Sequence, residues 1–387
     1  MSGHNELPLT QLRVLELANI LAGPLVGQFC AELGADVVKV EQPGLGDPTR
    51  GWYLATESRD SDVSAYFSCA NWGKRSIAID IATAAGRQLV QRLAAVSDVV
   101  VVGYKPGDEV NFGVDYATLA ALNPKLIYLQ VTAYGTGDER PGFDAIIQAE
   151  SGFTHLNGAP GGGPVKMPVA LIDLLAAHQL KEGLLLALLQ RAQTGRGAYI
   201  ATSLLAAATA SLANQASNYL HAGVVPAQMG SEHPNIAPYG TIFLTVDARE
   251  LVIAVGTQRQ FAAFVAALDL AELSADARFV DNASRVANRD ALNGLLAARI
   301  AECSSADIAA ALQADKVPFG FVNDMAAVFA APEAARQLFA DGRGVRTVAL
   351  QGDFAGADSL APPPHLDEHR AEILALLADL SPQEPAI

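Results

Sequence analysis

A strand–helix–strand pattern near the start of the chain constrains the fold most. Residues 12–17 alternate as a strand does, residues 22–33 have the pattern of a helix, and residues 37–41 form a second strand. A helix between two strands predicts a parallel sheet with a right-handed crossover. The four valines at 99–102 are typical of a strand covered on both faces. We therefore expect an α/β fold, with ligands bound outside the carboxyl ends of the strands.

The rest of the chain divides into two regions. At 387 residues it exceeds what one hydrophobic core usually serves, so two domains are expected. The first region continues with predicted strands at 77–81, 126–131 and 199–203, and helices at 84–96 and 204–219. The second region begins near Pro238 and is predicted to hold a hairpin, 241–246 with 250–255, then helices at 258–268, 289–302 and 306–313.

Composition excludes several classes of function. The net charge of −15 argues against a general binder of nucleic acids or acidic membranes, so an anionic ligand requires a local group of Lys and Arg. No signal peptide and no transmembrane run is recognised. Cys30, Cys69 and Cys303 match no metal-ligand spacing and are expected to be reduced, buried thiols of a cytoplasmic protein. The turn at Ala22-Gly-Pro24 lacks G-x-G-x-x-G, which disfavours a nicotinamide or flavin dinucleotide.

One carboxylate, Asp173, lies in an otherwise apolar run ahead of a long helix pattern that extends to Arg191. A carboxylate in such surroundings must be hydrogen-bonded, neutralised or used. Asp173 is therefore either a helix N-cap or a nucleophile at a helix N-terminus, where the helix dipole keeps it ionised and N–H groups hold developing charge. The two interpretations do not exclude each other.

Several short motifs occur in a specific order. They are Leu21-Ala-Gly-Pro24, Leu33-Gly-Ala-Asp-Val-Val-Lys-Val-Glu41, Gly46-Asp47 with Arg50, Lys74-Arg-Ser76, Pro106-Gly107, Thr194-Gly-Arg-Gly197 and His233-Pro-Asn-Ile-Ala-Pro-Tyr239. From about Leu12 onward the chain resembles the class III CoA-transferases, the family of formyl-CoA transferase, carnitine CoA-transferase and the α-methylacyl-CoA racemases.

The resemblance implies an architecture. It implies a large Rossmann-like domain with a parallel sheet (residues 1–220), a smaller inserted α/β domain (221–325) and a C-terminal segment (326–387) that returns to the large domain. It also implies an interlocked homodimer whose active sites lie between the two chains.

The resemblance also implies a chemistry. In the transferases an Asp attacks the donor thioester, and CoA moves to a free carboxylic acid through anhydride and enzyme-thioester intermediates. Asp173 matches that residue. Acyl-CoA and carboxylic acids are then the substrates, and no tightly bound cofactor, metal, nucleic acid or membrane is expected.

Residues at matching positions are expected to bind CoA. They are Asn19, Ile20, Ala22, Lys74, Arg75, Tyr104 and Lys105. Tyr104 could stack on adenine, and the cations could meet phosphates. Formyl-CoA transferase has Arg where this chain has Gln42 and Asn111, so the phosphate grip is expected to differ. Gly230–Pro234 is the nearest counterpart of the family's glycine-rich lid.

Two alternatives stay open beside the transferase. A racemase or epimerase needs a second acid/base group opposite Asp173. The family's racemases place a His where this chain has Phe143, and Phe cannot carry a proton, so the transferase is favoured; His155 and His178 are possible substitutes. The other alternative is a non-catalytic acyl-CoA-binding relative, against which the presence of Asp173 argues.

Overall fold

The chain forms two compact units in a computed structural model that describes residues 7–352, 356–357 and 359–380. The first unit comprises Met1–Gly152, Met167–Ala222 and Glu333–Ile387; the second comprises Phe153–Lys166 and Gly223–Pro332. Residues 153–166, which the sequence prediction assigned to the large domain, thus belong to the second unit.

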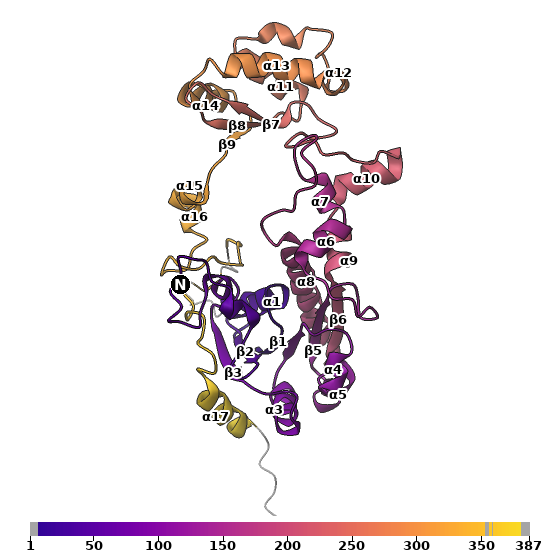
Figure 1. Cartoon of the computed structure of the whole chain (residues 1–387), viewed down its shortest axis with the longest axis vertical. Helices are drawn as coiled ribbons and strands as arrows, with labels where there is room; N and C mark the ends of the chain where they lie inside the picture. Colours follow the sequence, from indigo (N-terminus) through magenta and orange to yellow (C-terminus); the bar gives the residue numbers. More distant parts are fainter. Residues whose placement is uncertain (1–6, 353–355, 358, 381–387) are drawn as a thin grey trace, which may run out of the picture. The chain divides into compact units, whose positions relative to one another are not determined.

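A six-stranded sheet forms the centre of the first unit (Figure 1), and all of its paired strands are parallel. The strands are β1 (Arg13–Leu17), β2 (Asp36–Glu41), β3 (Lys74–Ala78), β4 (Val99–Val102), β5 (Ile127–Thr132) and β6 (Ala198–Ser203). Their order is β3-β2-β1-β4-β5-β6, so the winding direction changes between β1 and β4. Such a switch point opens a crevice at the carboxyl ends of the two strands. The predicted α/β class with a parallel sheet is confirmed.

Helices cover both faces of this sheet. On one face α1 (Ala22–Glu32) packs against α8 (Leu171–Thr194). The core of the other face includes side chains from α3 (Ala84–Ala95), α5 (Tyr116–Leu122) and α17 (Arg370–Leu380). The valines of β4 are fully buried between these layers, as their apolar run predicted. The shorter helices are η1 (Pro48–Gly51), α2 (Ala65–Ser68), α4 (Asp108–Asn111), α6 (Asp144–Glu150), α9 (Leu204–Ala210), α10 (Ala213–Ala222) and α16 (Pro332–Ala335).

Two predicted boundaries differ from the structure. The helix predicted at 204–219 is broken into α9 and α10, and Ala213 has φ 45°, which a continuous helix does not permit. The third strand begins at Lys74, three residues before the predicted start, because Lys74 and Ser76 turn inward and find buried polar partners there.

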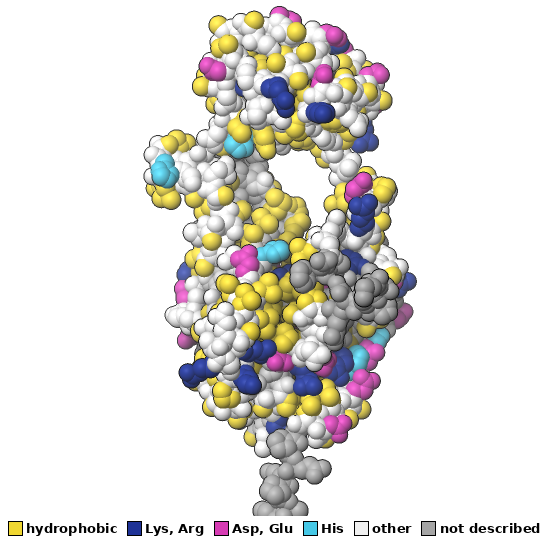
Figure 2. Space-filling model, turned by 180° about the vertical axis from the view of Figure 1, so that it is seen from behind, with side chains coloured by type: hydrophobic (Ala, Val, Ile, Leu, Met, Phe, Trp, Pro, Cys, Tyr) yellow, Lys and Arg dark blue, Asp and Glu magenta, His cyan; other side chains and the backbone are white. Residues whose placement is uncertain are grey.

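Part of the surface of the first unit is apolar. In Figure 2 its hydrophobic side chains gather in a continuous area, with charged side chains mainly around it. On α8, Leu185, Leu186 and Leu189 are all exposed. An apolar surface of this kind is typical of a protein–protein contact. Among the described residues, no helix is both long and apolar enough to cross a membrane.

The second unit is a small α/β body. Its antiparallel sheet, β7-β8-β9, consists of Tyr239–Leu244, Glu250–Ala254 and Phe319–Phe321, which confirms the predicted hairpin. Its helices are α7 (Phe153–Leu156), α11 (Gln258–Ala267), η2 (Ala271–Ser274), α12 (Asn282–Ala287), α13 (Arg289–Ile300), α14 (Ser305–Ala314) and α15 (Met325–Ala330). Apolar side chains of α11, α13 and α14 pack with the sheet in its core.

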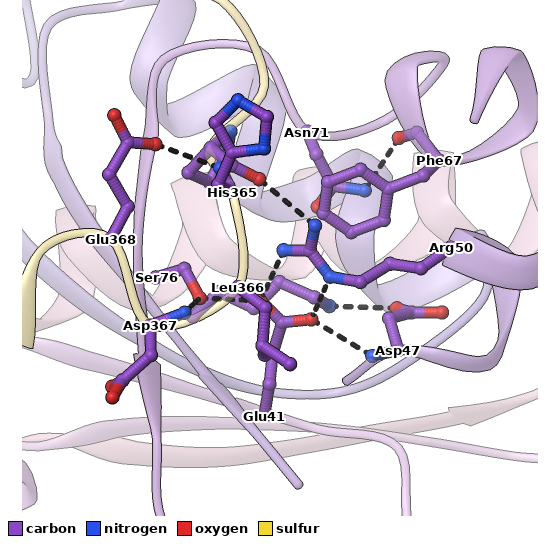
Figure 3. Close-up of polar contacts among 12 residues, drawn as sticks. Glu41, Asp47, Arg50, Phe67, Asn71, Ser76, His365, Leu366, Asp367 and Glu368 are labelled. Atoms are coloured by element: carbon purple, nitrogen blue, oxygen red, sulfur yellow. Dashed lines mark hydrogen bonds and ion pairs between the residues drawn. The ribbon is translucent and has the colours of Figure 1, made fainter. Parts of the chain in front are cut away.

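The C-terminal segment closes over the edge of the first unit's sheet at β3 (Figure 3). Arg50 donates to the Pro364 carbonyl (3.0 Å) and holds Glu41 through two hydrogen bonds, of 2.7 and 2.6 Å. Ser76 donates to Glu41 (2.6 Å) and accepts from the Asp367 N–H (3.1 Å). Residues close to both ends of the chain therefore share one buried polar network.

Candidate functional site

A cavity of about 280 Å³ opens at the carboxyl ends of β1, β4 and β5 in the first unit. Its walls come from the turn after β1, the turn after β4, the end of β5, the approach to α6 and the first turn of α8. The lining residues are Asn19, Ile20, Leu21, Ala22, Gly23, Gly103, Tyr104, Lys105, Pro106, Val131, Thr132, Ala133, Arg140, Pro141, Gly142, Phe143, Asp173 and Leu204. The cavity therefore occupies the switch point of the sheet, where the fold predicts a ligand.

Asp173 lies in the cavity wall, in the first turn of α8. Among the described residues, no group hydrogen-bonds to its carboxylate. Burial, reinforced by the nearby charge of Asp144, raises the pKa of Asp173 to about 7. This direction is opposite to the one expected from the helix dipole alone, because burial and a like charge both favour the neutral form of Asp173. Asp173 is a carboxylate with the basicity of an imidazole.

Asp144, at the start of α6, accepts a hydrogen bond from the first turn of α8, which is the role that the N-cap interpretation gave to Asp173. The N-cap position of α8 is Ala170, and Asp173 makes no cap hydrogen bond. Instead, Asp144 accepts the Ile172 N–H (2.8 Å) and the side-chain amide of Gln148 (2.6 Å). The N-cap interpretation of Asp173 is therefore wrong, and its carboxylate is left for chemistry. Asp144 was not among the residues predicted for the site; the signal that could have found it was an acidic residue beside Phe143 at a helix start.

Five of the predicted CoA-binding residues line this cavity. They are Asn19, Ile20, Ala22, Tyr104 and Lys105. Tyr104 packs edge-on against Phe112 (ring centroids 5.4 Å apart), and burial raises its pKa to about 12, so it stays neutral. Lys105 forms an exposed ion pair with Glu139 (3.2 Å), which a ligand phosphate can readily replace.

Lys74 and Arg75 lie elsewhere, because they belong to strand β3 rather than to a loop. Lys74 is buried and bonds to Glu16 (2.8 Å), the Pro24 carbonyl and Asn71. Burial lowers its pKa to about 8. Arg75 donates from Nη2 to both carboxylate oxygens of Asp36 (2.7 and 2.6 Å) and from Nε to one of them (3.0 Å). Carboxylates of the protein pair with both side chains, and neither residue lines the cavity; their contact with a CoA phosphate stays a prediction.

Phe143 lines the cavity that contains Asp173. Its side chain is exposed and offers an apolar wall without an ionisable group. His155 and His178, the possible substitutes, are not among the lining residues: His155 lies in the second unit, and His178 is on the exposed side of α8. Within the described chain, the cavity therefore presents carboxylate chemistry without a histidine.

The glycine-rich segments of the second unit contact each other. The Gly230 N–H donates to the Gly158 carbonyl (2.9 Å), and Gln228 donates to the Asn157 carbonyl (3.1 Å). The role of Gly230–Pro234 as a lid stays a prediction. The expectation of three buried thiols is wrong for Cys69, which is exposed after α2, whereas Cys30 is buried.

Comparisons with known proteins decide the family. The sequence model of CoA-transferase family III matches residues 9–370. The chain is a family III CoA-transferase. A succinate–glutarate CoA-transferase of Agrobacterium fabrum is 37% identical over 385 residues, covering 96% of each chain. An acetyl-CoA:oxalate CoA-transferase of Acetobacter aceti is 32% identical, covering 95% of each chain.

A solved structure of this family has the same architecture. The CAIB/BAIF family protein of Brucella suis superposes with a TM-score of 0.83 at 41% identity, covering 96% of this chain and 100% of that one. The predicted family membership and enzyme class are confirmed, and CoA thioesters are the substrates that such a transferase uses.

Proposed function

We propose that this CoA-transferase moves CoA from an acyl-CoA thioester to a free carboxylic acid through a covalent intermediate on Asp173. One observation supports this proposal most strongly. The carboxylate of Asp173, whose pKa is raised, lines the cavity at the sheet's switch point and has no hydrogen-bond partner among the described residues. A carboxylate left free in this way can act as a nucleophile.

The reaction balances without an external acid or base. A carboxylate oxygen of Asp173 attacks the thioester carbonyl, the C–S bond breaks, and CoA leaves as the thiolate from a mixed anhydride. The thiolate then attacks the Asp173 carbonyl carbon, which releases the first acid as its carboxylate and leaves an enzyme thioester. The acceptor carboxylate repeats both steps in reverse order and regenerates Asp173.

Two helix N-termini support this chemistry. Asp173 lies in the first turn of α8, and Ala22 and Gly23, in the first turn of α1, line the same cavity. No side chain caps α1, so its first N–H groups are available to a tetrahedral oxyanion. The raised pKa of Asp173 makes its ionised form a stronger nucleophile than an ordinary carboxylate.

The CoA contacts that we propose are Asn19, Ile20, Ala22, Tyr104 and Lys105, all on the cavity wall. Lys74 and Arg75 are left out because carboxylates of the protein already neutralise them.

The acids exchanged are proposed to be dicarboxylic. The relatives are named for succinate, glutarate, oxalate and mesaconate, each of which carries a second carboxylate. Arg140 also lines the cavity and could meet that group, whereas Lys105 is assigned to CoA. The cations Lys105 and Arg140 are paired with the exposed Glu139 and the half-buried Asp138, and a ligand could displace these carboxylates.

We further propose an interlocked homodimer in the cytoplasm, with the second unit as the inserted small domain. The continuous apolar area of the first unit and the exposed leucines of α8 support a contact with a second copy.

Trapping of the enzyme thioester tests the proposed function. The protein is incubated with succinyl-CoA and treated with borohydride or hydroxylamine, and the modified peptide is located by mass spectrometry. Modification of Asp173, with transfer of CoA to glutarate, is expected. Transfer without modification, or modification at another residue, would contradict the covalent route through Asp173.

A further inference from the structure

The turn after β1 holds an unusual backbone conformation at the cavity wall. Ile20 has φ 72°, in the left-handed region, which a β-branched residue rarely adopts. Among the described residues, the other non-glycine positions with positive φ are Ala213, Ala248, Asp269, Lys316 and Asp367, none of which is β-branched. A conformation of this kind is strained and persists only where its surroundings impose it.

A buried ion pair imposes this conformation. The Ile20 N–H donates to the carboxylate of Asp47, at 3.1 and 3.3 Å from its two oxygens. Lys39 pairs with Asp47 (2.9 Å) and also donates to the Ala18 carbonyl (2.7 Å). The peptide groups on both sides of Asn19 are thus tied to one pair of opposite charges.

The pair is fixed by its own neighbours. Both side chains are fully buried, and Lys39 also bonds to Glu16 (3.0 Å). Asp47 accepts from the Thr49 N–H (3.0 Å) and hydroxyl (2.8 Å). Burial opposes ionisation of Asp47, but the charge of Lys39 and these hydrogen bonds hold its pKa below the usual value. The pair therefore stays charged at neutral pH and serves as a rigid support rather than as a proton donor.

Glu41 fixes the backbone of Asp47 from the other side (Figure 3). It accepts the Asp47 N–H (2.9 Å) while it is held by Arg50. A chain of buried contacts thus runs from the C-terminal segment, through Arg50 and Glu41, to the turn at Ile20. Removing one partner of a buried pair leaves the other charge unpaired, so each link is costly to lose.

We propose that Asp47 and Lys39 are positioning residues for CoA transfer. By holding Ile20 in the left-handed conformation, they set where the N-terminus of α1 begins and how residues 19–22 form the cavity wall. This inference rests on the proposed function, because that wall is the proposed CoA contact. A misplacement of about 1 Å in such a wall can lower the rate about 100-fold.

A double-mutant cycle tests the proposal. Asp47→Asn should lower kcat/KM for succinyl-CoA and glutarate about 10- to 100-fold and weaken binding of free CoA, measured by calorimetry. Glycine adopts φ 72° without strain, so in an Ile20→Gly variant the turn no longer depends on Asp47 to hold this conformation. Asp47→Asn should therefore lower kcat/KM and CoA affinity several-fold less in the Ile20→Gly background than in the wild type.

A matched variant separates positioning from loss of stability. Asp98 pairs with Arg191 (3.1 Å) and accepts the Arg13 N–H (3.0 Å) at the opposite, amino end of the sheet. Asp98→Asn should therefore lower the melting temperature without changing the Kd for CoA. Where Asp47→Asn does not fold, Asp47→Glu retains the buried charge but displaces the acceptor of the Ile20 N–H, and it enters the same cycle.

The outcomes are distinct from those of the proposed function. The positioning role would be overturned if Asp47→Asn lowered kcat/KM and CoA affinity equally in the wild type and in Ile20→Gly. It would also be overturned if Asp47→Asn bound CoA no more weakly than Asp98→Asn does. If the wild-type protein binds CoA but transfers none, the proposed function fails, and the cycle of Kd values still decides the inference.

Discussion

At the residue scale, Asp173 combines two opposing influences. A helix N-terminus favours its ionised form, whereas burial and Asp144 favour the neutral form and raise its pKa to about 7. The consequence is a carboxyl group that is about half ionised near pH 7.

The proposed role of Asp173 and its raised pKa predict how Asp173→Asn and the wild type should behave. The variant should retain less than about one hundredth of the transfer rate, because a covalent nucleophile is lost, while it still binds CoA. The wild-type rate should rise with pH toward a plateau above pH 7, as Asp173 ionises.

Stability should change in the opposite direction from activity. The folded-state pKa of Asp173 lies above its ordinary value of 3.8, so the wild type loses stability as pH rises from about 4 to about 7. The Asp173→Asn variant should not lose stability in this way, because asparagine does not ionise. At pH 8 the variant should be more stable by up to about 4 kcal/mol, since each pKa unit corresponds to about 1.36 kcal/mol. Urea unfolding at several pH values measures this; an advantage that does not grow with pH would contradict the raised pKa.

Phe143 predicts the absence of racemase activity. It gives the cavity an apolar wall without a second proton carrier, so the wild type should not exchange the α-proton of a 2-methylacyl-CoA with deuterated water. Proton NMR of the recovered thioester measures the exchange. Rapid exchange that needs no acceptor acid would favour the racemase alternative.

At the element scale, hydrophobic periodicity predicted the sheet well, and it failed where polar side chains turn inward. The valines of β4 can only be buried, so that strand was predicted with its observed limits. Lys74 was predicted to bind CoA, because its buried partner Glu16 is 58 residues away in the sequence and no local pattern indicates that pair. The same holds for the site: Asp173 was recognised by its apolar surroundings, whereas the cap from Asp144 depends on tertiary contact.

The packing of α1 against the buried side chain of Glu16 gives a further prediction. A Cβ at Gly27 would lie 1.9 Å from a carboxylate oxygen of Glu16, so Gly27→Ala should destabilise the fold by about 2 kcal/mol or more. Gly294, also within a helix, has open space around it. There the same substitution should stabilise the protein by about 0.5–1 kcal/mol through helix propensity. Urea unfolding of both variants gives the comparison, and similar effects at the two sites would contradict close packing at Gly27.

At the scale of the whole molecule, assembly is the main prediction. If two chains interlock, each copy completes the other's core, and no folded monomer should exist at accessible concentrations. Sedimentation across a wide dilution series should show only the dimer. A reversible equilibrium with a folded monomer would exclude the interlocked arrangement, although a simpler dimer could still form through the apolar area of the first unit.

The closure of the C-terminal segment over β3 has a consequence for the newly made chain. Ser76 accepts a hydrogen bond from Asp367, which is synthesised 291 residues later. At about 5–20 residues per second, that delay is roughly 15–60 seconds. During this time Arg50 and Glu41 are without the segment that seals them from water. The edge of the first unit's sheet at β3 is therefore completed only after the C-terminal segment has been synthesised.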